Sequence, residues 1–328
     1  ILERLVYKRT LRFLVSCKIL SNFQFGFRQK HSTTHALLTF IDKVAHAIDD
    51  VSHTIGVFLD FSKAFDTIDH DILLYKLTHY GIRGKALDWF RDYLTDRKQY
   101  VSINGHESSM KLISCGVPQG SLLGPLLFTL YINDLQNSSQ ILSFICFADD
   151  TNLFFSHRNP NTLTHILNNE LKHVQSWIHA NKLSLNIDKT HYMLFSNSLQ
   201  VIPNDVIIND INLIQVDSTK FLGLHIDSDL SWKTHINFLS KILSRNTGIL
   251  NKLKHFFPCH ILQTIYSTLI SPYLNYGILA WGNSSKLLLD SLFLLQKRAI
   301  RIVNHAEYLS HTIDLFRENK VLKMIDMF

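Results

Sequence analysis

The chain has 328 residues, 46% of them hydrophobic, and a formal net charge of +6 at pH 7. This size is sufficient for a large buried core and for two or three subdomains. Its apolar runs are shorter than the roughly 18 residues that span a bilayer, and its four cysteines form no CxxC pair. The composition therefore argues against a membrane-spanning protein, a disulfide framework and a structural zinc site, and we expect a soluble intracellular protein.

The charge is unevenly distributed along the chain. Residues 1–50 carry a net charge of +4, residues 51–230 carry −5, and residues 231–328 carry +7. An acidic centre between two basic flanks is the distribution expected of a metal-binding floor between two phosphate-binding walls. The alternative for either flank is a solvated basic surface without a ligand.

The first elements in the chain are a helix, a loop and a second helix in residues 1–50. Next comes a β-rich apolar run, Val57-Phe58-Leu59, which ends at Asp60. Asp60 thus lies at the carboxyl end of a predicted buried strand, where a sheet can set it beside other acids. The alternative role for Asp60 is the N-cap of a following helix.

Two short helices and a strand are predicted before the next motif. Apolar residues recur at helical spacing over residues 72–80 and 85–94. Residues 100–105 end in Asn104-Gly105 and predict a strand that enters a turn.

A segment rich in proline and glycine follows at residues 116–125. It predicts a loop and then a helix that opens near Pro125. Gly120 and Gly124 would let the backbone approach a flat or charged ligand closely, and Gln119 could hydrogen-bond that ligand. The alternative is a loop that serves only as the entry to the helix.

Two adjacent acids, Asp149 and Asp150, lie between the strand-like runs 141–147 and 153–155. A hairpin turn can aim both carboxylates into one cleft, where a divalent metal offsets their repulsion; hard oxygen ligands favour Mg²⁺ or Mn²⁺. Together with Asp60 they would form a pocket for two metals about 3.5–4 Å apart, which is suited to in-line phosphoryl transfer. The alternative is an ordinary polar turn.

The rest of the chain is helix-rich. Residues 161–180 predict one amphipathic helix, residues 207–213 and 221–226 predict late strands, and residues 231–328 predict helices. In this basic tail, the helical spacing of Lys297, Arg298 and Arg301 places the three cations together, as a helix that grips nucleic-acid phosphates would. The alternatives are a solvated helix or one that docks onto another domain.

These motifs, in this order, resemble those of reverse transcriptases, and the closest likeness is to the polymerases of non-LTR (LINE-type, jockey-like) retrotransposons. Asp60 with Phe65, then Pro118-Gln119-Gly120, then Ala148-Asp149-Asp150 are similar to motifs A, B and C. Further similar blocks, which extend the likeness over nearly the whole chain, are residues 24–28 and 32–34 (fingers), 183–190 (motif D), 221–224 (motif E), and 272–277, 281–282 and 295–299 (tail).

The resemblance implies an α+β right-hand polymerase, with fingers in residues 1–50, a palm with an antiparallel sheet in residues 51–230, and a helical thumb and C-terminal extension in residues 231–328. It implies an RNA-directed DNA polymerase that uses an RNA template, a DNA primer, deoxynucleotides and two Mg²⁺ ions, or Mn²⁺, in the nucleus and cytoplasm. The alternatives are a group II intron or retron polymerase, or a catalytically silent RNA-binding protein.

The resemblance also implies roles for individual residues. Asp60, Asp149 and Asp150 would hold the metals with the backbone carbonyl of Phe61, and Lys189 would protonate the departing pyrophosphate, although an exposed lysine is the alternative. Phe65 resembles the steric gate that excludes a ribose 2′-hydroxyl, although a core aromatic is the alternative. The remaining expected roles are triphosphate binding by Arg28 and Lys30, nucleotide contact by Gln119 and Gly120, and a primer grip at Phe221, Leu222 and Gly223.

The sequence departs from a complete element protein in three respects. It starts at Ile1 without a methionine, has no endonuclease ahead of the fingers and has no cysteine-rich knuckle. We therefore expect a fragment of a longer protein in which an endonuclease domain lies upstream.

Overall fold

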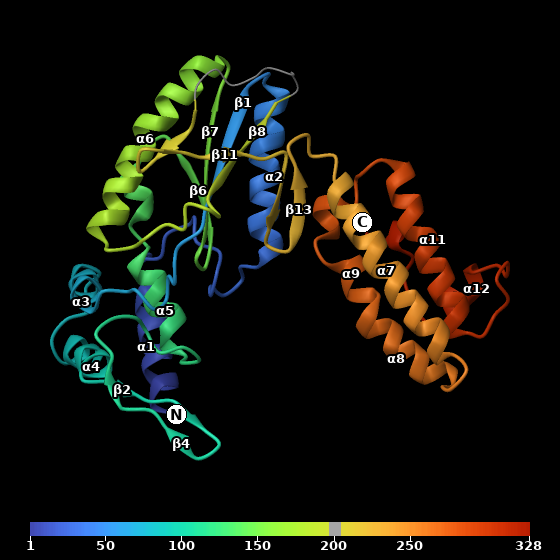
Figure 1. The fold of residues 1–328 in the computed structure, drawn as a ribbon, viewed down its shortest axis with the longest axis horizontal. Coiled ribbons are helices and arrows are strands. Elements are labelled where there is room, and N and C mark those ends of the chain that lie inside the picture. Colours follow the sequence, from blue (N-terminus) through green and yellow to red (C-terminus); the bar gives the residue numbers. More distant parts are fainter. Residues whose placement is uncertain (197–204) are drawn as a thin grey trace. The chain divides into compact units, whose positions relative to one another are not determined.

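The computed structural model describes residues 1–196 and 205–328, which form two compact units (Figure 1). Residues 1–36 and 43–216 make up the first, hereafter the N-terminal unit. Residues 37–42 and 217–328 make up the second, hereafter the C-terminal unit. Within these described ranges, no helix has the length and apolar character needed to cross a membrane.

A five-stranded sheet forms the centre of the N-terminal unit, in the order β11-β8-β1-β7-β6. β1 pairs antiparallel with β7 and β8, β6 pairs antiparallel with β7, and β11 runs parallel to β8. β1 is buried except for its half-buried first residue, as expected of a strand covered on both faces. The strands are β1 His53–Leu59, β6 Ser143–Phe147, β7 Asp150–His157, β8 His191–Phe195 and β11 Ile214–Gln215.

Helices pack around this sheet, and α6 lies against β7 and β1. Ser32, Asp69 and Asn159 are the N-caps of α2, α3 and α6, where each side-chain oxygen accepts a hydrogen bond from a backbone N–H of the first turn. The cap at Asp69 shows that the alternative role of Asp60 as a helix N-cap is wrong, because the next helix begins ten residues later. The helices of this unit are α1 Leu2–Ser16, α2 Thr33–Asp49 apart from its residues 37–42, which belong to the C-terminal unit, α3 His70–His79, α4 Lys85–Leu94, α5 Leu123–Tyr131, the 3₁₀ helix Leu135–Ser138 and α6 Pro160–Ala180.

Short exposed hairpins complete the N-terminal unit. The strand and turn predicted at residues 100–105 belong to one of them, but the single strand predicted at residues 207–213 is wrong. That segment is a hairpin, because Asn209 and Asp210 both have positive φ, 51° and 59°, as a tight turn between two strands requires. The paired strands are β2 Lys98–Gln99 with β5 Lys111–Leu112, β3 Ser102–Ile103 with β4 His106–Glu107, and β9 Ile207–Ile208 with β10 Ile211–Asn212.

The C-terminal unit is a helical bundle with one hairpin. Residues 221–226, predicted as a strand, instead span the turn of that hairpin. In the bundle, α7 packs along α11, and Trp281 is fully buried with its Nε1 donating to the carbonyl of Tyr276 at 2.9 Å. The elements are β12 Ser218–Phe221, β13 Leu224–Asp227, α7 Lys233–Leu253, α8 Cys259–Leu269, α9 Ser271–Asn275, α10 Ile278–Trp281, α11 Lys286–Val303, α12 Ile313–Glu318 and the 3₁₀ helix Met324–Asp326.

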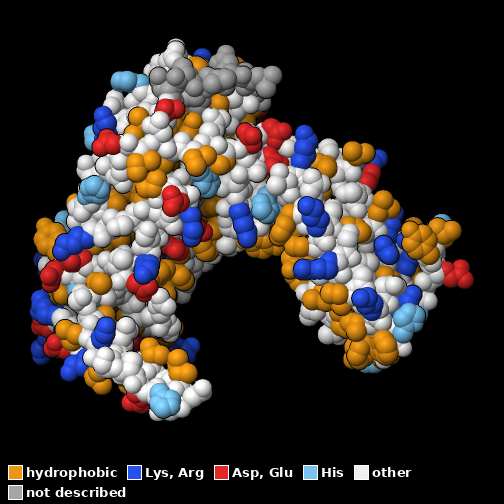
Figure 2. All heavy atoms as spheres, viewed as in Figure 1, with side chains coloured by type: hydrophobic (Ala, Val, Ile, Leu, Met, Phe, Trp, Pro, Cys, Tyr) orange, Lys and Arg blue, Asp and Glu red, His pale blue; other side chains and the backbone are white. Residues whose placement is uncertain are grey.

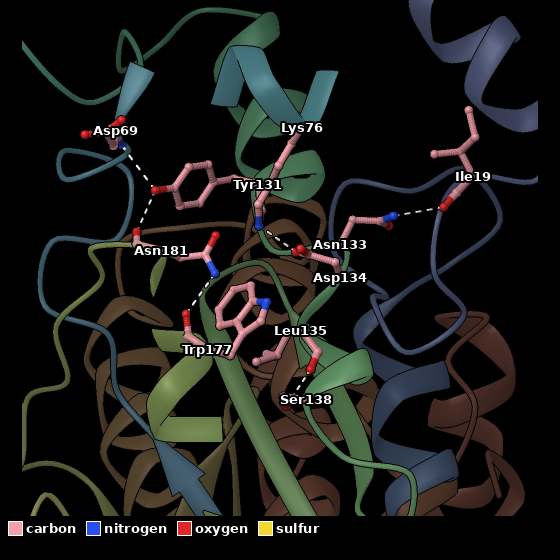
Figure 3. A network of polar contacts seen from close by, with 10 residues as sticks. All are labelled: Ile19, Asp69, Lys76, Tyr131, Asn133, Asp134, Leu135, Ser138, Trp177 and Asn181. Atoms are coloured by element: carbon pink, nitrogen blue, oxygen red, sulfur yellow. Dashed lines mark hydrogen bonds and ion pairs between the residues drawn. The ribbon is translucent and has the colours of Figure 1, made fainter. Parts of the chain in front are cut away.

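A buried polar network joins α3, α5 and α6 in the N-terminal unit (Figure 3). The ammonium group of Lys76 lies 2.6 Å from Oδ1 of Asp134 and donates to the carbonyl oxygen of Tyr131 at 2.5 Å. It also lies 4.8 Å from the ring centre of Trp177, a cation–π contact. The hydroxyl of Tyr131 in turn donates to the carbonyl of Asn181 at 2.6 Å. Burial lowers the pKa of Lys76, and the charge of Asp134 opposes that effect.

Lys76→Met is expected to lower the free energy of unfolding by about 2 to 4 kcal/mol, because it leaves a half-buried carboxylate and a buried carbonyl without their shared donor. The double variant Lys76→Met/Asp134→Asn should recover part of this loss, since it removes the unpaired charge. Denaturant unfolding of both variants measures the effect. An unchanged midpoint for Lys76→Met would show that the pair contributes nothing to stability.

Candidate active site

Strand pairing places the three predicted acids at one end of the sheet. β6 and β7 are joined by a two-residue loop, Ala148-Asp149, and Phe147 pairs with Asp150. Leu59 of β1 pairs with Thr151 of β7. Because the strands are antiparallel, Asp60, which follows Leu59, lies opposite Asp150, which precedes Thr151. The sheet therefore brings Asp60, Asp149 and Asp150 together.

The acids influence one another electrostatically. Desolvation by the protein atoms around its carboxyl group, together with the negative charges of Asp149 and Asp60, raises the pKa of Asp150 to about 6, although the residue keeps accessible surface. In residues 1–196 and 205–328, Asp60, Asp149 and Asp150 take part in no ion pair with a basic side chain. Such an uncompensated cluster of hard oxygen donors is suited to a divalent cation. Among the described residues, however, no three or more His, Cys, Asp or Glu side chains are placed so that together they could hold a metal ion.

The segment 183–190 lies against the residues that follow β1. The backbone N–H of Asn186 donates to the carbonyl of Asp60 at 2.8 Å, and the N–H of Ser62 donates to the carbonyl of Ser184 at the same distance. These bonds, with a bridge between Phe61 and Leu185, tie the segment to the strand end that carries Asp60. Phe61 is buried, whereas Lys189 is exposed three residues beyond Asn186.

Phe65 lies between two other aromatic rings. It stacks on Phe128 of α5, with ring centres 4.5 Å apart, and meets the ring of Phe27 edge-on at 6.3 Å. The residue is half-buried, so part of its ring remains accessible. The stacking on Phe128 of α5 shows that Phe65 packs as an aromatic of the core, as the alternative predicts, whereas its role as a steric gate stays a prediction.

The glycine-rich loop 116–120 is attached to the segment that carries Phe65. The N–H of Val117 donates to the carbonyl of Phe65 at 2.9 Å, and Nε2 of Gln119 donates to Oδ1 of Asp66 at 2.8 Å. Gly116 has φ 84°, and a Cβ there would lie 2.7 Å from the carbonyl oxygen of Asp66, so that this contact requires glycine. Gly120 has φ 78° and open space around it. Gln119 thus lies near the predicted gate, with its amide engaged by a carboxylate.

Arg28 and Lys30 line a pocket of about 650 Å³ together with Lys18. The pocket lining contains these three basic side chains and no acidic one. Nη1 of Arg28 donates to the carbonyl oxygens of Ser21 and Gln24, the latter at 3.1 Å. Part of the Arg28 guanidinium therefore holds its own loop in place, whereas Lys30 is exposed.

The predicted primer-grip residues form the β12–β13 hairpin of the C-terminal unit. Leu222 and Gly223 occupy its turn with φ values of 46° and 85°, and Phe221 is buried with its ring centre 5.9 Å from that of Phe40. The hydroxyl of Tyr276 donates to the carbonyl of Leu222 at 2.6 Å, and a Cβ on Gly223 would lie 3.1 Å from the Tyr276 ring. Tyr276 thus anchors the turn.

The predicted nucleic-acid contacts Lys297, Arg298 and Arg301 lie on α11. Arg298 is exposed, whereas Lys297 lies over the ring of Phe293 at 4.2 Å and Arg301 donates from Nε to the carbonyl of Ser310 at 2.8 Å. Figure 2 shows lysine and arginine side chains scattered over the visible face of the C-terminal unit, with apolar side chains between them.

No role was predicted from the sequence for three residues that contact either a predicted site residue or the turn beside one. Gln24 binds the turn that carries Asp149, Asp66 accepts from Gln119, and Tyr276 anchors the Leu222 turn. Gln24 and Tyr276 stand inside segments that the sequence singles out, residues 24–28 and 272–277. Their position inside these motifs could have marked them as candidates. The atoms that they bind, however, depend on contacts between segments that are distant in the sequence.

Residues 1–226 match the family model described as "Reverse transcriptase (RNA-dependent DNA polymerase)". The chain is 29% identical to the RNA-directed DNA polymerase from mobile element jockey of Drosophila melanogaster, over 99% of this chain and 36% of that protein. It is 28% identical to the probable RNA-directed DNA polymerase from transposon BS of the same fly, over 96% of this chain and 36% of that protein. The chain thus spans little more than a third of the length of these relatives.

Two solved telomerase structures resemble the chain. The telomerase from Candida albicans, in complex with a TWJ fragment of telomeric RNA, matches with a TM-score of 0.55 and 12% identity over 98% of this chain and 58% of that one. The apo telomerase from Candida tropicalis matches with a TM-score of 0.53 and 12% identity over 92% of this chain and 50% of that one. At this identity the likeness shows the fold alone, and it confirms the expected α+β right-hand polymerase.

Proposed function

The chain belongs to the reverse transcriptase (RNA-dependent DNA polymerase) family, and on this premise we propose that it is an RNA-directed DNA polymerase of a non-LTR retrotransposon. The observation that carries the proposal is the position of Asp60 opposite Asp150, with Asp149 in the adjoining turn. In the proposed reaction the primer 3′-hydroxyl attacks the α-phosphate of a deoxynucleotide and pyrophosphate leaves. Positioning and electrostatic stabilisation, without a covalent enzyme intermediate, supply the catalysis.

The acids at the strand ends would hold two Mg²⁺ ions, or Mn²⁺ in their place. The fit rests on the donor set of three carboxylates. Desolvation and the charges of the other two acids raise the pKa of Asp150, and no described basic side chain forms an ion pair with any of the three. Asp60 and Asp149 would be the principal ligands, with Asp150 and the carbonyl of Phe61 beside them. When bound, two such ions stabilise the charge on the attacking and leaving oxygens.

Other residues would bind the nucleotide. The accessible part of the Phe65 ring would exclude a ribose 2′-hydroxyl, and Gln119 and Gly120 would contact the nucleotide from the loop beside it. Arg28 and Lys30 would pair with the triphosphate, and the exposed Lys189 would donate a proton to pyrophosphate. The two bonds from Nη1 of Arg28 to its own loop leave several guanidinium N–H groups for such a partner.

The polymerase subdomains would follow the chain order. We assign fingers to residues 1–50, the palm to residues 51–230 and the thumb with its extension to residues 231–328. The hairpin at Phe221, Leu222 and Gly223 would contact the primer strand. As a retrotransposon protein, it would act in the nucleus and cytoplasm on an RNA template, a DNA primer and deoxynucleotides.

A primer-extension assay tests this function directly. The purified chain is incubated with an oligo(dT) primer annealed to poly(rA), labelled dTTP, and Mg²⁺ or Mn²⁺. We expect extension that requires the RNA template and stops when EDTA is added. Retention of the template–primer in a binding assay without any extension would instead identify a catalytically silent RNA-binding protein.

Basic residues of α11 would grip the nucleic-acid backbone. Residues 231–328 carry 12 lysine and arginine residues against 5 aspartate and glutamate residues. Replacing Lys297, Arg298 and Arg301 with alanine should therefore weaken binding of template–primer duplexes of all sequences alike, because phosphates carry no base information. Each lost phosphate contact should flatten the slope of log K against log salt by about 0.7 to 0.9.

Fluorescence titration of template–primer at several salt concentrations measures that slope. A matched control replaces Arg317, Lys320 and Lys323 with alanine, which removes the same charge from another part of the same unit. If both triple variants flatten the slope equally, general attraction by net charge explains the binding. If the α11 variant keeps the wild-type slope, this helix is not on the nucleic-acid path.

A further inference from the structure

Residues 23–26 extend the central sheet beside β6, next to the turn that carries Asp149. The N–H of Cys146 donates to the carbonyl of Phe23, and the N–H of Phe25 donates to the carbonyl of Cys146, both at 2.8 Å. Gln24 thereby pairs with Cys146 in a parallel bridge. A segment from the start of the chain thus runs along the outer edge of the strand that leads into the acidic hairpin.

The side chain of Gln24 continues this pairing beyond the end of the strand. It is 1% exposed and binds both polar groups of Ala148: Oε1 accepts from the Ala148 N–H at 3.0 Å, and Nε2 donates to the Ala148 carbonyl at 3.1 Å. Oε1 also accepts from the N–H of Gly26 at 2.7 Å. The amide of one buried glutamine therefore substitutes for a strand residue at the turn.

The turn needs such a support, because Ala148 has φ 56°. This left-handed conformation is unfavourable for a residue that carries a Cβ, so it persists only where surrounding contacts hold it. Gly26 allows the close approach, since a Cβ there would lie 2.2 Å from the nitrogen of Ala148. Gln24 and Gly26 together hold the backbone immediately before Asp149.

We propose that Gln24 is a positioning residue that holds the strained Ala148 turn and so keeps Asp149 and Asp150 opposite Asp60. The proposal rests on the polymerase function proposed above. Gln24 acts through the backbone of the turn and touches neither substrate nor the reacting atoms. The geometry requires one acceptor and one donor at the end of a two-carbon stem, which asparagine is too short to supply and an ionised glutamate cannot supply because it has no donor.

Gln24→Ala should lower kcat for primer extension on the order of 100-fold, because it releases the turn that positions two of the acids. The KM for template–primer should stay within about twofold, since a turn that only positions the acids contributes to the transition state and little to ground-state binding. Gly26→Ala should cause a similar loss of kcat, because its methyl group displaces the Ala148 peptide.

Ala148→Gly provides a rescue that a merely structural role would not give. Glycine adopts positive φ without a steric cost, so the turn depends less on its support. The double variant Gln24→Ala/Ala148→Gly should therefore regain at least about tenfold in kcat over Gln24→Ala, or about 1.4 kcal/mol of activation free energy. If Ala148→Gly fails to raise kcat in the Gln24→Ala background, the strained turn is not what Gln24 supports.

Asn133→Ala is the matched control for the loss of a buried amide. Asn133 is also buried, and its side chain accepts from the N–H of Ser21 at 2.8 Å and donates to the carbonyl of Ile19 at 2.9 Å, earlier in the same N-terminal segment. It should lower the melting temperature as Gln24→Ala does, because it also removes buried hydrogen bonds. It should keep kcat within about threefold, because its hydrogen bonds do not reach the turn. An equal loss of kcat in both variants would overturn the proposal.

Hydrogen exchange followed by mass spectrometry tests the support itself without relying on activity. A peptide that spans Ala148 should exchange faster in Gln24→Ala than in the wild type or in Asn133→Ala, because the Ala148 N–H loses its acceptor. If the peptide exchanges faster in Gln24→Ala but the wild-type chain does not extend primers, Gln24 supports the Ala148 turn and the proposed polymerase function is wrong. Unchanged exchange of that peptide in Gln24→Ala would show that Gln24 does not hold the Ala148 turn.

Discussion

Asp149→Asn and Asp60→Asn are each expected to abolish primer extension on an RNA template while the fold stays intact. Each variant removes a charged ligand from the proposed two-metal site, and the loss of one group that stabilises transition-state charge costs on the order of 10³-fold in rate. The structure also predicts how Asp149→Asn affects the stability of the fold. Desolvation, together with the charges of Asp149 and Asp60, raises the pKa of Asp150 to about 6, above that of an unfolded chain. A raised carboxyl pKa means that the ionised group destabilises the folded state at neutral pH, and loss of the Asp149 charge relieves part of this cost.

Asp149→Asn should therefore melt at or above the wild-type temperature at pH 7 although it is inactive. Thermal denaturation and primer extension on the same preparations measure both effects. Asp92→Asn, which neutralises an exposed carboxylate on α4, is the control and should keep full activity. Incorporation close to the wild-type rate by either active-site variant under Mg²⁺ would show that the three-carboxylate site is wrong.

Phe65→Val is expected to shift nucleotide selection toward ribonucleotides, with Phe65→Ala giving a larger shift. The shortened side chain would open room for a 2′-hydroxyl, and exclusion by clash would be lost without a new attraction. The ratio of kcat/KM for dTTP to that for UTP should fall about tenfold or more, as for other changes of pocket volume. A competition assay on poly(rA) primed with oligo(dT) measures this ratio.

Stacking of Phe65 on Phe128 means that the same change also loosens the core, and the alanine variant more than the valine variant. Phe155→Val, at another half-buried phenylalanine of the N-terminal unit, separates the two effects. It should lower the melting temperature but leave the dTTP to UTP ratio unchanged. An unchanged ratio in an active Phe65→Val enzyme would assign Phe65 to packing alone.

Local sequence patterns were sufficient to predict several elements and the order of the motifs. The helices at residues 85–94 and 161–180 follow from apolar spacing and end signals, and their boundaries agree with α4 and α6 to within one residue. The apolar runs on either side of Asp149 and Asp150 predicted the hairpin, and the apolar run before Asp60 predicted that a strand ends there. These features depend on side-chain periodicity and turn preference within about ten residues, which the sequence records directly.

Other features depend on pairing between distant segments, and local pattern does not record it. The register that sets Asp60 opposite Asp150 requires β1 and β7 to be neighbours. The hairpin at residues 207–213 was missed because apolar residues on both sides of Asn209 and Asp210 imitate one continuous strand. The two turn-forming residues, Asn209 and Asp210, were given less weight than the apolar residues around them.

The partners of the polar side chains were also decided by tertiary structure. Arg28 was expected to bind a triphosphate, and the structure shows it bound to carbonyls of its own loop, while Gln119 binds Asp66. Gln24 carried no expected role, because a glutamine in a loop looks like a surface residue until β6 is placed beside it. The sequence by itself determined which groups the chain could bring to a site. The order of strands in the sheet decided which backbone and side-chain atoms each of them meets, because a hydrogen bond depends on distances that only the folded chain sets.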